Sequence, residues 1–112
     1  MTTYKRQDVV LIPFPFSDLS SSKQRPAIVL ATVDARQELI CMMLTSTFRT
    51  DYSVDIQVTD ITSAGLPKPT VARTSRLFTI TNELVRKKIG EISDSDFKAI
   101  IKKLLELLHI NQ

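Results

Sequence analysis

Short runs of β-branched and aromatic residues, each followed by a turn, occupy most of the first 92 residues of this 112-residue chain. Only residues 94–109 have strong helical periodicity. A chain of many short strands and one helix has few ways to bury its apolar residues. The pattern predicts one domain over residues 1–112: a mainly β, small antiparallel barrel packed by a C-terminal amphipathic helix.

The expected elements are separated by segments that contain Pro, Gly, Ser and Asp, which favour turns. We expect strands at 8–14, 25–33, 39–47, 52–58, 70–80 and 87–92, and a single helical turn at 81–86. Ser93 and Asp96 resemble a capping box for the helix, with Asp in place of the usual Glu. The apolar face of the helix, expected to pack on the core, consists of Phe97, Ile100, Ile101, Leu104, Leu107 and Leu108.

The amino-acid composition is that of an ordinary, mildly basic globular domain. Hydrophobic residues make up 43% and charged residues 24%, as in an ordinary globular domain, and the net charge of +3 favours a polyanionic partner without requiring one. Cys41 is the only cysteine, so no internal disulfide is possible, and we expect a buried, inert thiol. Because no signal-peptide segment or membrane-length apolar run is present, we expect a cytoplasmic protein without membrane contact.

The residue inventory restricts the chemistry by which such a chain would act on nucleic acid. His109 is the only histidine, which excludes a ribonuclease that uses two histidines. The acidic residues are dispersed and zinc ligands are lacking, so we expect no metal site and no cofactor. Arginines, lysines and hydroxyls remain. They suit RNA, because RNA carries its own nucleophile in the 2′-OH and an arginine pairs with two phosphate oxygens at once.

Arg25 and Thr45 are a cation and a hydroxyl at the ends of two predicted neighbouring strands. Pro26 favours an extended backbone at Arg25, which places this cation at the start of a strand. Thr45 lies toward the end of the next strand, and in an antiparallel pair the start of one strand lies beside the end of the other. We therefore expect the two side chains to meet. Taken without a family pattern, the favoured interpretation of Arg25 is a charge that flanks an aggregation-prone strand. For Thr45, a β-forming residue at a strand end is the competing interpretation.

Five segments, in order along nearly the whole chain, resemble the MazF/PemK family of type II toxin–antitoxin ribonucleases. The most specific is Arg-Pro-Ala followed by aliphatic residues after a polar loop. The segments are QDVVLIPFPFSD (7–18), KQRPAIVL (23–30), LTST (44–47), LPKPTVARTSRLFTI (66–80) and KKIGEIS (87–93).

The resemblance implies an SH3-like barrel of the MazF/CcdB type that forms a homodimer. It implies a toxin that cleaves single-stranded RNA, such as mRNA, sequence-selectively and without a metal, by 2′-OH attack that leaves a 2′,3′-cyclic phosphate. It also implies a cognate antitoxin, with contact to operator DNA only through that antitoxin.

Within this resemblance, Arg25 and Thr45 align with the family's catalytic arginine and threonine. Other residues near the same mouth are candidate RNA contacts, and a solvated surface role is open for each: Phe16, Lys23, Gln24, Ser46, Arg49 and Arg76. Phe16 is expected either to stack on a base or to anchor its loop on the barrel.

The chain also departs from the family. The loop before Arg25 lacks the glycine and glutamate of many relatives, and Ser75 stands where relatives often have an acidic residue. The general base is therefore unassigned. Two alternatives stay open: a non-enzymatic, CcdB-like gyrase inhibitor and a catalytically silent RNA-binding homologue. The C-terminal LLELLHINQ contains no recognisable gyrase-binding motif.

Overall fold

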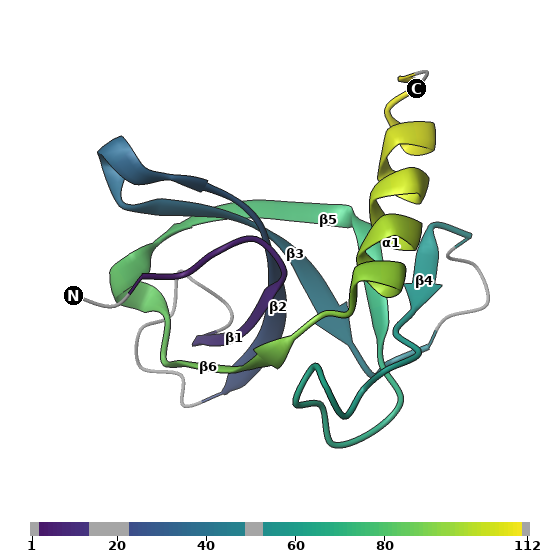
Figure 1. Cartoon of the computed structure of the whole chain (residues 1–112), viewed down its shortest axis with the longest axis horizontal. Coiled ribbons are helices and arrows are strands. Elements are labelled where there is room, and N and C mark those ends of the chain that lie inside the picture. Colours follow the sequence, from purple (N-terminus) through teal and green to yellow (C-terminus); the bar gives the residue numbers. More distant parts are fainter. Residues whose placement is uncertain (1–2, 14–22, 49–52, 111–112) are drawn as a thin grey trace.

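Six antiparallel strands form one sheet with the order β4-β5-β3-β2-β1-β6, and one helix packs against it (Figure 1). The computed structural model describes residues 3–13, 23–48 and 53–110. The elements are β1 (Asp8–Pro13), β2 (Gln24–Val33), η1 (Asp34–Arg36), β3 (Glu38–Thr45), β4 (Asp55–Gln57), β5 (Val71–Thr81), η2 (Asn82–Leu84), β6 (Lys87–Glu91) and α1 (Asp94–Leu107).

The predicted mainly β fold with a C-terminal helix is confirmed, but two strands are shorter than predicted. β4 has only three residues, because Ser53 and Val54 lie in a turn and Val58 leaves the strand to enter the core. β3 ends at Thr45 rather than Thr47, because a side-chain hydrogen bond turns the backbone there. Phe14, predicted as the end of the first strand, lies outside the described residues.

The predicted closure into a barrel is wrong for the described part of the chain, where β4 and β6 are the edges of the sheet. The connector 60–69 lies against β6 instead of a closing strand. The Glu91 amide donates to the Ser63 carbonyl at 3.0 Å, and the Ser63 hydroxyl donates to the Glu91 carbonyl at 3.1 Å. The sheet is nevertheless strongly curved (Figure 1), with irregular register in three strand pairs.

Both glycines of the chain serve the contact between this connector and β6. Gly65 has a φ of 73°, and a Cβ atom there would lie 1.9 Å from the Ile89 carbonyl oxygen. A Cβ atom on Gly90 would lie 2.3 Å from the Ala64 carbonyl carbon. The two backbones therefore approach at a distance that no side chain permits.

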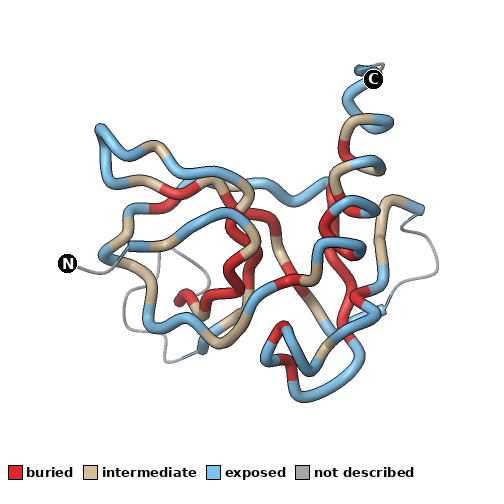
Figure 2. The backbone as a smooth tube through the Cα atoms, in the orientation of Figure 1, coloured by how far each residue is buried: buried red, intermediate tan, exposed pale blue. Residues whose placement is uncertain are grey.

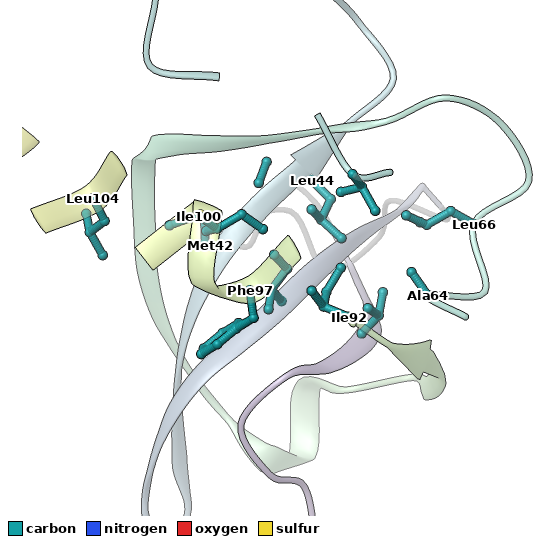
Figure 3. Packing of buried hydrophobic residues seen from close by; sticks show 12 residues of the cluster. Met42, Leu44, Ala64, Leu66, Ile92, Phe97, Ile100 and Leu104 are labelled. Atoms are coloured by element: carbon teal, nitrogen blue, oxygen red, sulfur yellow. The ribbon is translucent and has the colours of Figure 1, made fainter. Parts of the chain in front are cut away.

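Many residues of the sheet strands are buried (Figure 2). Residues on the two faces of these strands belong to two apolar clusters, as period-two strands require. The helix-side cluster lies between the sheet and α1 and includes Ile28, Met42, Leu44, Phe97 and Ile100 (Figure 3). The second cluster is built from residues of the opposite strand face: Val10, Ile12, Ala27, Val29, Leu39, Cys41 and Ile80. Burial raises the pKa of the Cys41 thiol to about 12, which agrees with the expected inert cysteine.

The apolar face of α1 is buried only along its first turns. Phe97, Ile100 and Leu104 are buried, and burial of each such side chain contributes about 1.5–3 kcal/mol. Leu107 and Leu108 are 39% and 51% exposed, so their predicted core packing is wrong. The C-terminal end of the helix projects beyond the sheet (Figure 1). Among the described residues, no helix has the length and apolarity needed to cross a membrane.

Only half of the predicted capping box forms at the start of α1. The Ser93 hydroxyl accepts a hydrogen bond from the Asp96 amide at 3.2 Å. The buried Asp96 carboxylate instead accepts from the Thr59 amide (3.0 Å), the Thr59 hydroxyl (2.7 Å) and the Asp60 amide (3.0 Å). Burial alone would raise the pKa of Asp96, but these hydrogen bonds outweigh it and lower the pKa. Asp96 thereby fastens the helix to the segment after β4.

We expect Asp96→Asn to lower the free energy of unfolding by about 1–3 kcal/mol at pH 7, because an amide cannot accept all three hydrogen bonds. The contribution of Asp96 is complete above its ordinary pKa of 3.8 and is lost as the pH falls through the lower, folded value. Urea unfolding between pH 7 and pH 2 should therefore show a smaller acid destabilisation in the variant. Asp94→Asn, the same charge change at an exposed site of the same turn, should cost less than about 1 kcal/mol. Equal effects of the two variants would contradict this account.

Candidate active site

Arg25 and Thr45 lie at the same end of the two central strands. Arg25 is the second residue of β2 and pairs with Ile12 of β1. β2 and β3 pair through Val29 with Cys41 and Ala27 with Met43. Arg25 lies two residues before Ala27 and Thr45 two residues after Met43, so both lie at the same strand end, just beyond the last paired residues. By strand alternation both project on the face of the second apolar cluster. Each is partly exposed.

A short turn fixes the hydroxyl end of β3. The Thr47 amide donates a hydrogen bond of 3.0 Å to the Thr45 hydroxyl oxygen. This is a local side-chain to backbone bond of the kind that ends strands at Ser and Thr. Because the oxygen already accepts a hydrogen bond, the hydroxyl hydrogen can be donated elsewhere. Ser46 and Thr47 are both exposed beside it.

A buried ion pair between β4 and β5 supports this turn. Arg73 Nε lies 3.0 Å from Asp55 Oδ1, and Arg73 Nη2 lies 2.8 Å from Asp55 Oδ2. The two side chains are only 8% and 10% exposed. Arg73 Nη2 also donates to the Thr47 carbonyl at 3.0 Å. The ion pair therefore ties the turn after β3 to the neighbouring strands.

Our sequence reading did not identify Arg73 or Asp55 as part of the site. The alternating pattern of residues 52–58 indicated a half-exposed strand, on which Asp55 is an ordinary solvated acid. The available signal was Arg73 itself, a cation between Ala72 and Thr74 in a strand that is otherwise buried there. Such a cation needs a buried partner, although the sequence does not say which acid supplies it.

The other candidate residues differ in how close they lie to Arg25 and Thr45 along the strands. Lys23 is exposed just before β2, and Gln24 opens that strand opposite Pro13. Ser46 follows Thr45 directly. Arg76 is exposed on β5. It lies in an irregular part of the β3–β5 pairing, where residues 73–76 of β5 are opposite the single residue Met43 of β3. Phe16 and Arg49 lie outside the described residues.

Lys5 and Lys88 differ from Arg25 in their pairing with acidic side chains. Lys5 and Lys88 each pair with the buried carboxylate of Asp8 and with Glu91, at 3.0–3.2 Å. Hydrogen bonds to Glu91 and then to Asp8 raise the pKa of both lysines. Within the described ranges, by contrast, no acidic side chain pairs with Arg25. An arginine that none of the described acids engages suits the binding of an anion such as a phosphate.

The described residues bring together a guanidinium, a hydroxyl and polar side chains at one end of β2 and β3. No group of three or more His, Cys, Asp or Glu side chains with the spacing of a metal site occurs in this part of the chain. Asp55, the acid linked to this turn through Arg73, is held in an ion pair. His109 lies beyond the end of α1, which projects away from the sheet (Figure 1). The arrangement suits binding and polarising a phosphate.

Several solved structures share this fold. The MazE–MazF structure of Form-III from Deinococcus radiodurans has a TM-score of 0.77 at 15% identity, over 98% of this chain and 100% of that chain. A mycobacterial endoribonuclease in complex with its cognate antitoxin has a TM-score of 0.74 at 16% identity, over 98% and 99%. The Mycobacterium tuberculosis toxin MazF-mt6 has a TM-score of 0.72 at 18% identity, over 94% and 99%.

Identities this low establish the fold alone, and no curated protein matches the sequence significantly. The family-level evidence comes from the sequence model of the PemK-like, MazF-like toxins, which matches residues 5–108. This match covers all the described strands and the whole of α1. The chain therefore belongs to the PemK-like, MazF-like toxins of type II toxin–antitoxin systems.

Proposed function

We propose that this protein is an endoribonuclease toxin that cleaves single-stranded RNA, including mRNA, without a metal ion. The observation that supports the proposal is the antiparallel pairing of β2 with β3, because Arg25 and Thr45 each lie two residues beyond the last pair, Ala27 with Met43, at the same strand end. A guanidinium beside a hydroxyl suits a phosphodiester whose own 2′-OH is the nucleophile. Membership in a toxin family whose fold relatives include endoribonucleases supports the same reaction.

In the proposed reaction the 2′ oxygen attacks the adjacent phosphorus and the bond to the 5′ oxygen breaks. The products are a 2′,3′-cyclic phosphate and a 5′-hydroxyl, so the proton lost by the 2′-OH is balanced by one gained at the 5′ oxygen. Arg25 pairs with the phosphate oxygens as their negative charge grows, and it stays protonated throughout. Thr45 donates its hydroxyl hydrogen to the same phosphate group.

Ser75 stands directly before Arg76, where relatives often have an acidic residue, so that position supplies no carboxylate as a proton acceptor. We propose that the RNA backbone and bases flanking the scissile phosphate contact further polar and aromatic residues around the site. These are Phe16, Lys23, Gln24, Ser46, Arg49 and Arg76.

The proposed partners are a second copy of the chain and a cognate antitoxin, both in the cytoplasm, where mRNA is present. One fold relative was solved with its cognate antitoxin and another as a MazE–MazF structure. Several large apolar side chains are exposed and form surface that a partner can cover. They are Phe48, Leu77, Leu107, Leu108 and Ile110. Contact with operator DNA is proposed only through the antitoxin.

We expect Arg25→Ala to lower the rate of RNA cleavage by about 10²–10³-fold or more, as when one donor to a developing oxyanion is removed. The measurement uses a long mixed-sequence RNA in excess EDTA. Arg36→Ala is the matched control, because Arg36 is an exposed arginine in η1, at the opposite end of the same two strands. It should cleave at nearly the wild-type rate.

Three outcomes would contradict the proposal. Full activity of Arg25→Ala would remove the arginine from the reaction. RNA binding that weakens with salt but yields no new 5′ ends would indicate a silent RNA-binding homologue. Intact RNA together with DNA-damage signalling on expression would indicate a CcdB-like gyrase inhibitor.

We expect Thr45→Val, which keeps the shape of the side chain and removes its hydroxyl, to lower the turnover number by about 10-fold or more while KM changes little. The hydroxyl acts on charge that develops in the transition state, so ground-state binding is largely preserved. Thr32→Val is the matched control, because Thr32 is an exposed threonine elsewhere on β2. Equal turnover numbers for the two variants would exclude the Thr45 hydroxyl from catalysis.

A further inference from the structure

We infer that Arg73 is a positioning residue for Thr45 and that it acts through the carbonyl of Thr47. The inference rests on the proposed ribonuclease activity, since it assigns to Arg73 the task of holding a hydroxyl that the reaction uses. Two hydrogen bonds carry it. Arg73 Nη2 donates to the Thr47 carbonyl at 3.0 Å, and the Thr47 amide donates to the Thr45 hydroxyl oxygen at 3.0 Å.

The Arg73 side chain is itself held rigidly. Its two bonds to Asp55, at 3.0 Å and 2.8 Å, fix the plane of the guanidinium as well as its position. Asp55 and Arg73 are directly paired residues of β4 and β5, so the two backbones add to this constraint. The atom that donates to Thr47 therefore has a defined place relative to the sheet.

Thr47 is consequently restrained at both its amide and its carbonyl. The hydrogen bond to the amide directs one lone pair of the Thr45 oxygen toward Thr47, which limits the directions open to the hydroxyl hydrogen. A shift of the Thr47 backbone by about 1 Å would reorient this hydroxyl. Displacements of that size at a catalytic group lower rates by as much as about 10²-fold.

The burial of the Arg73 side chain argues for a positioning role and against direct contact with RNA. The Arg73 side chain is only 8% exposed and engages Asp55 through two atoms, whereas Arg25 and Arg76 present more surface to solvent. A cation so enclosed does not need the substrate to neutralise it. Asp55 is needed as well, because without it the guanidinium loses the partner that orients it.

The test replaces the whole ion pair by apolar side chains of similar size, in the double variant Arg73→Met/Asp55→Leu. Such exchanges often leave a fold intact, and thermal unfolding checks this directly. Arg36→Met/Glu38→Leu is the matched control, because it removes an exposed Arg–Glu pair whose nitrogen and oxygen lie 3.7 Å apart. Arg73→Lys is a second variant that keeps the charge but lacks the planar fork needed to serve Asp55 and Thr47 together.

We expect the double variant to cleave RNA with a turnover number lowered by about 10–100-fold and a KM changed by less than about 3-fold. Arg73→Lys should show a loss in the same direction, and the control pair should show none. In a Thr45→Val background, removing the Arg73–Asp55 pair should lower the rate by less than a further factor of about 3, because the hydroxyl to be positioned is gone.

A readout without RNA tests the structural part of the inference, the hold of Arg73 on the turn, separately from the proposed function. Hydrogen exchange of the Thr47 amide, followed by NMR, should be at least about 10-fold faster in the double variant and in Arg73→Lys than in the wild type and the control pair. If the wild type cleaves no RNA, the proposed function fails while this comparison still decides whether Arg73 holds the turn.

Four outcomes would overturn the inference. One is unchanged Thr47 exchange in folded Arg73 variants. Another is full turnover by Arg73→Lys. A rise in KM without a fall in turnover number would instead indicate that Arg73 contacts RNA. Losses that multiply fully with that of Thr45→Val would show that Arg73 acts independently of the hydroxyl.

Discussion

The antiparallel pairing of β2 with β3 is the constraint on which the rest of the molecule depends. These strands are the two middle members of the sheet, and their register assigns alternate residues to the two apolar clusters. A slip by one residue would exchange the faces of Ile28 and Ala27 and expose the core. The same register leaves Arg25 and Thr45 at one end of the two strands, each two residues beyond the pair Ala27–Met43. One set of backbone hydrogen bonds therefore specifies both the core and the candidate site.

Around this pair, the molecule uses polar contacts to fasten segments that apolar packing alone leaves free. Asp96 joins α1 to the segment after β4, and the Arg73–Asp55 pair joins β4 and β5 to the turn after β3. Asp96 is buried and the Asp55 side chain is only 10% exposed, and the hydrogen bonds of each carboxylate to specific donors define a geometry. Apolar side chains supply most of the stability, whereas these carboxylates determine which backbone atoms meet.

Local patterns in the sequence predicted most of the fold, because alternation and helical periodicity express burial directly. They also predicted that Arg25 and Thr45 lie at the same end of the two central strands, since strand order and antiparallel pairing are sufficient for that step. They did not predict which acid pairs with Arg73 or that Asp96 bonds to Thr59, because these contacts join residues far apart in the chain. Exposure of Leu107 and Leu108 was likewise missed, since a helical stripe does not reveal how far the sheet beneath it extends.

The central claim is that Arg25 and Thr45 assist attack by the RNA's own 2′-OH. The most direct measurement is the chemistry of the new ends, determined by mass spectrometry of fragments formed from RNA in excess EDTA. The account predicts a 2′,3′-cyclic phosphate on one fragment and a 5′-hydroxyl on the other, with DNA of the same sequence left intact. Ends carrying 3′-hydroxyl and 5′-phosphate groups, or cleavage of the DNA, would contradict it.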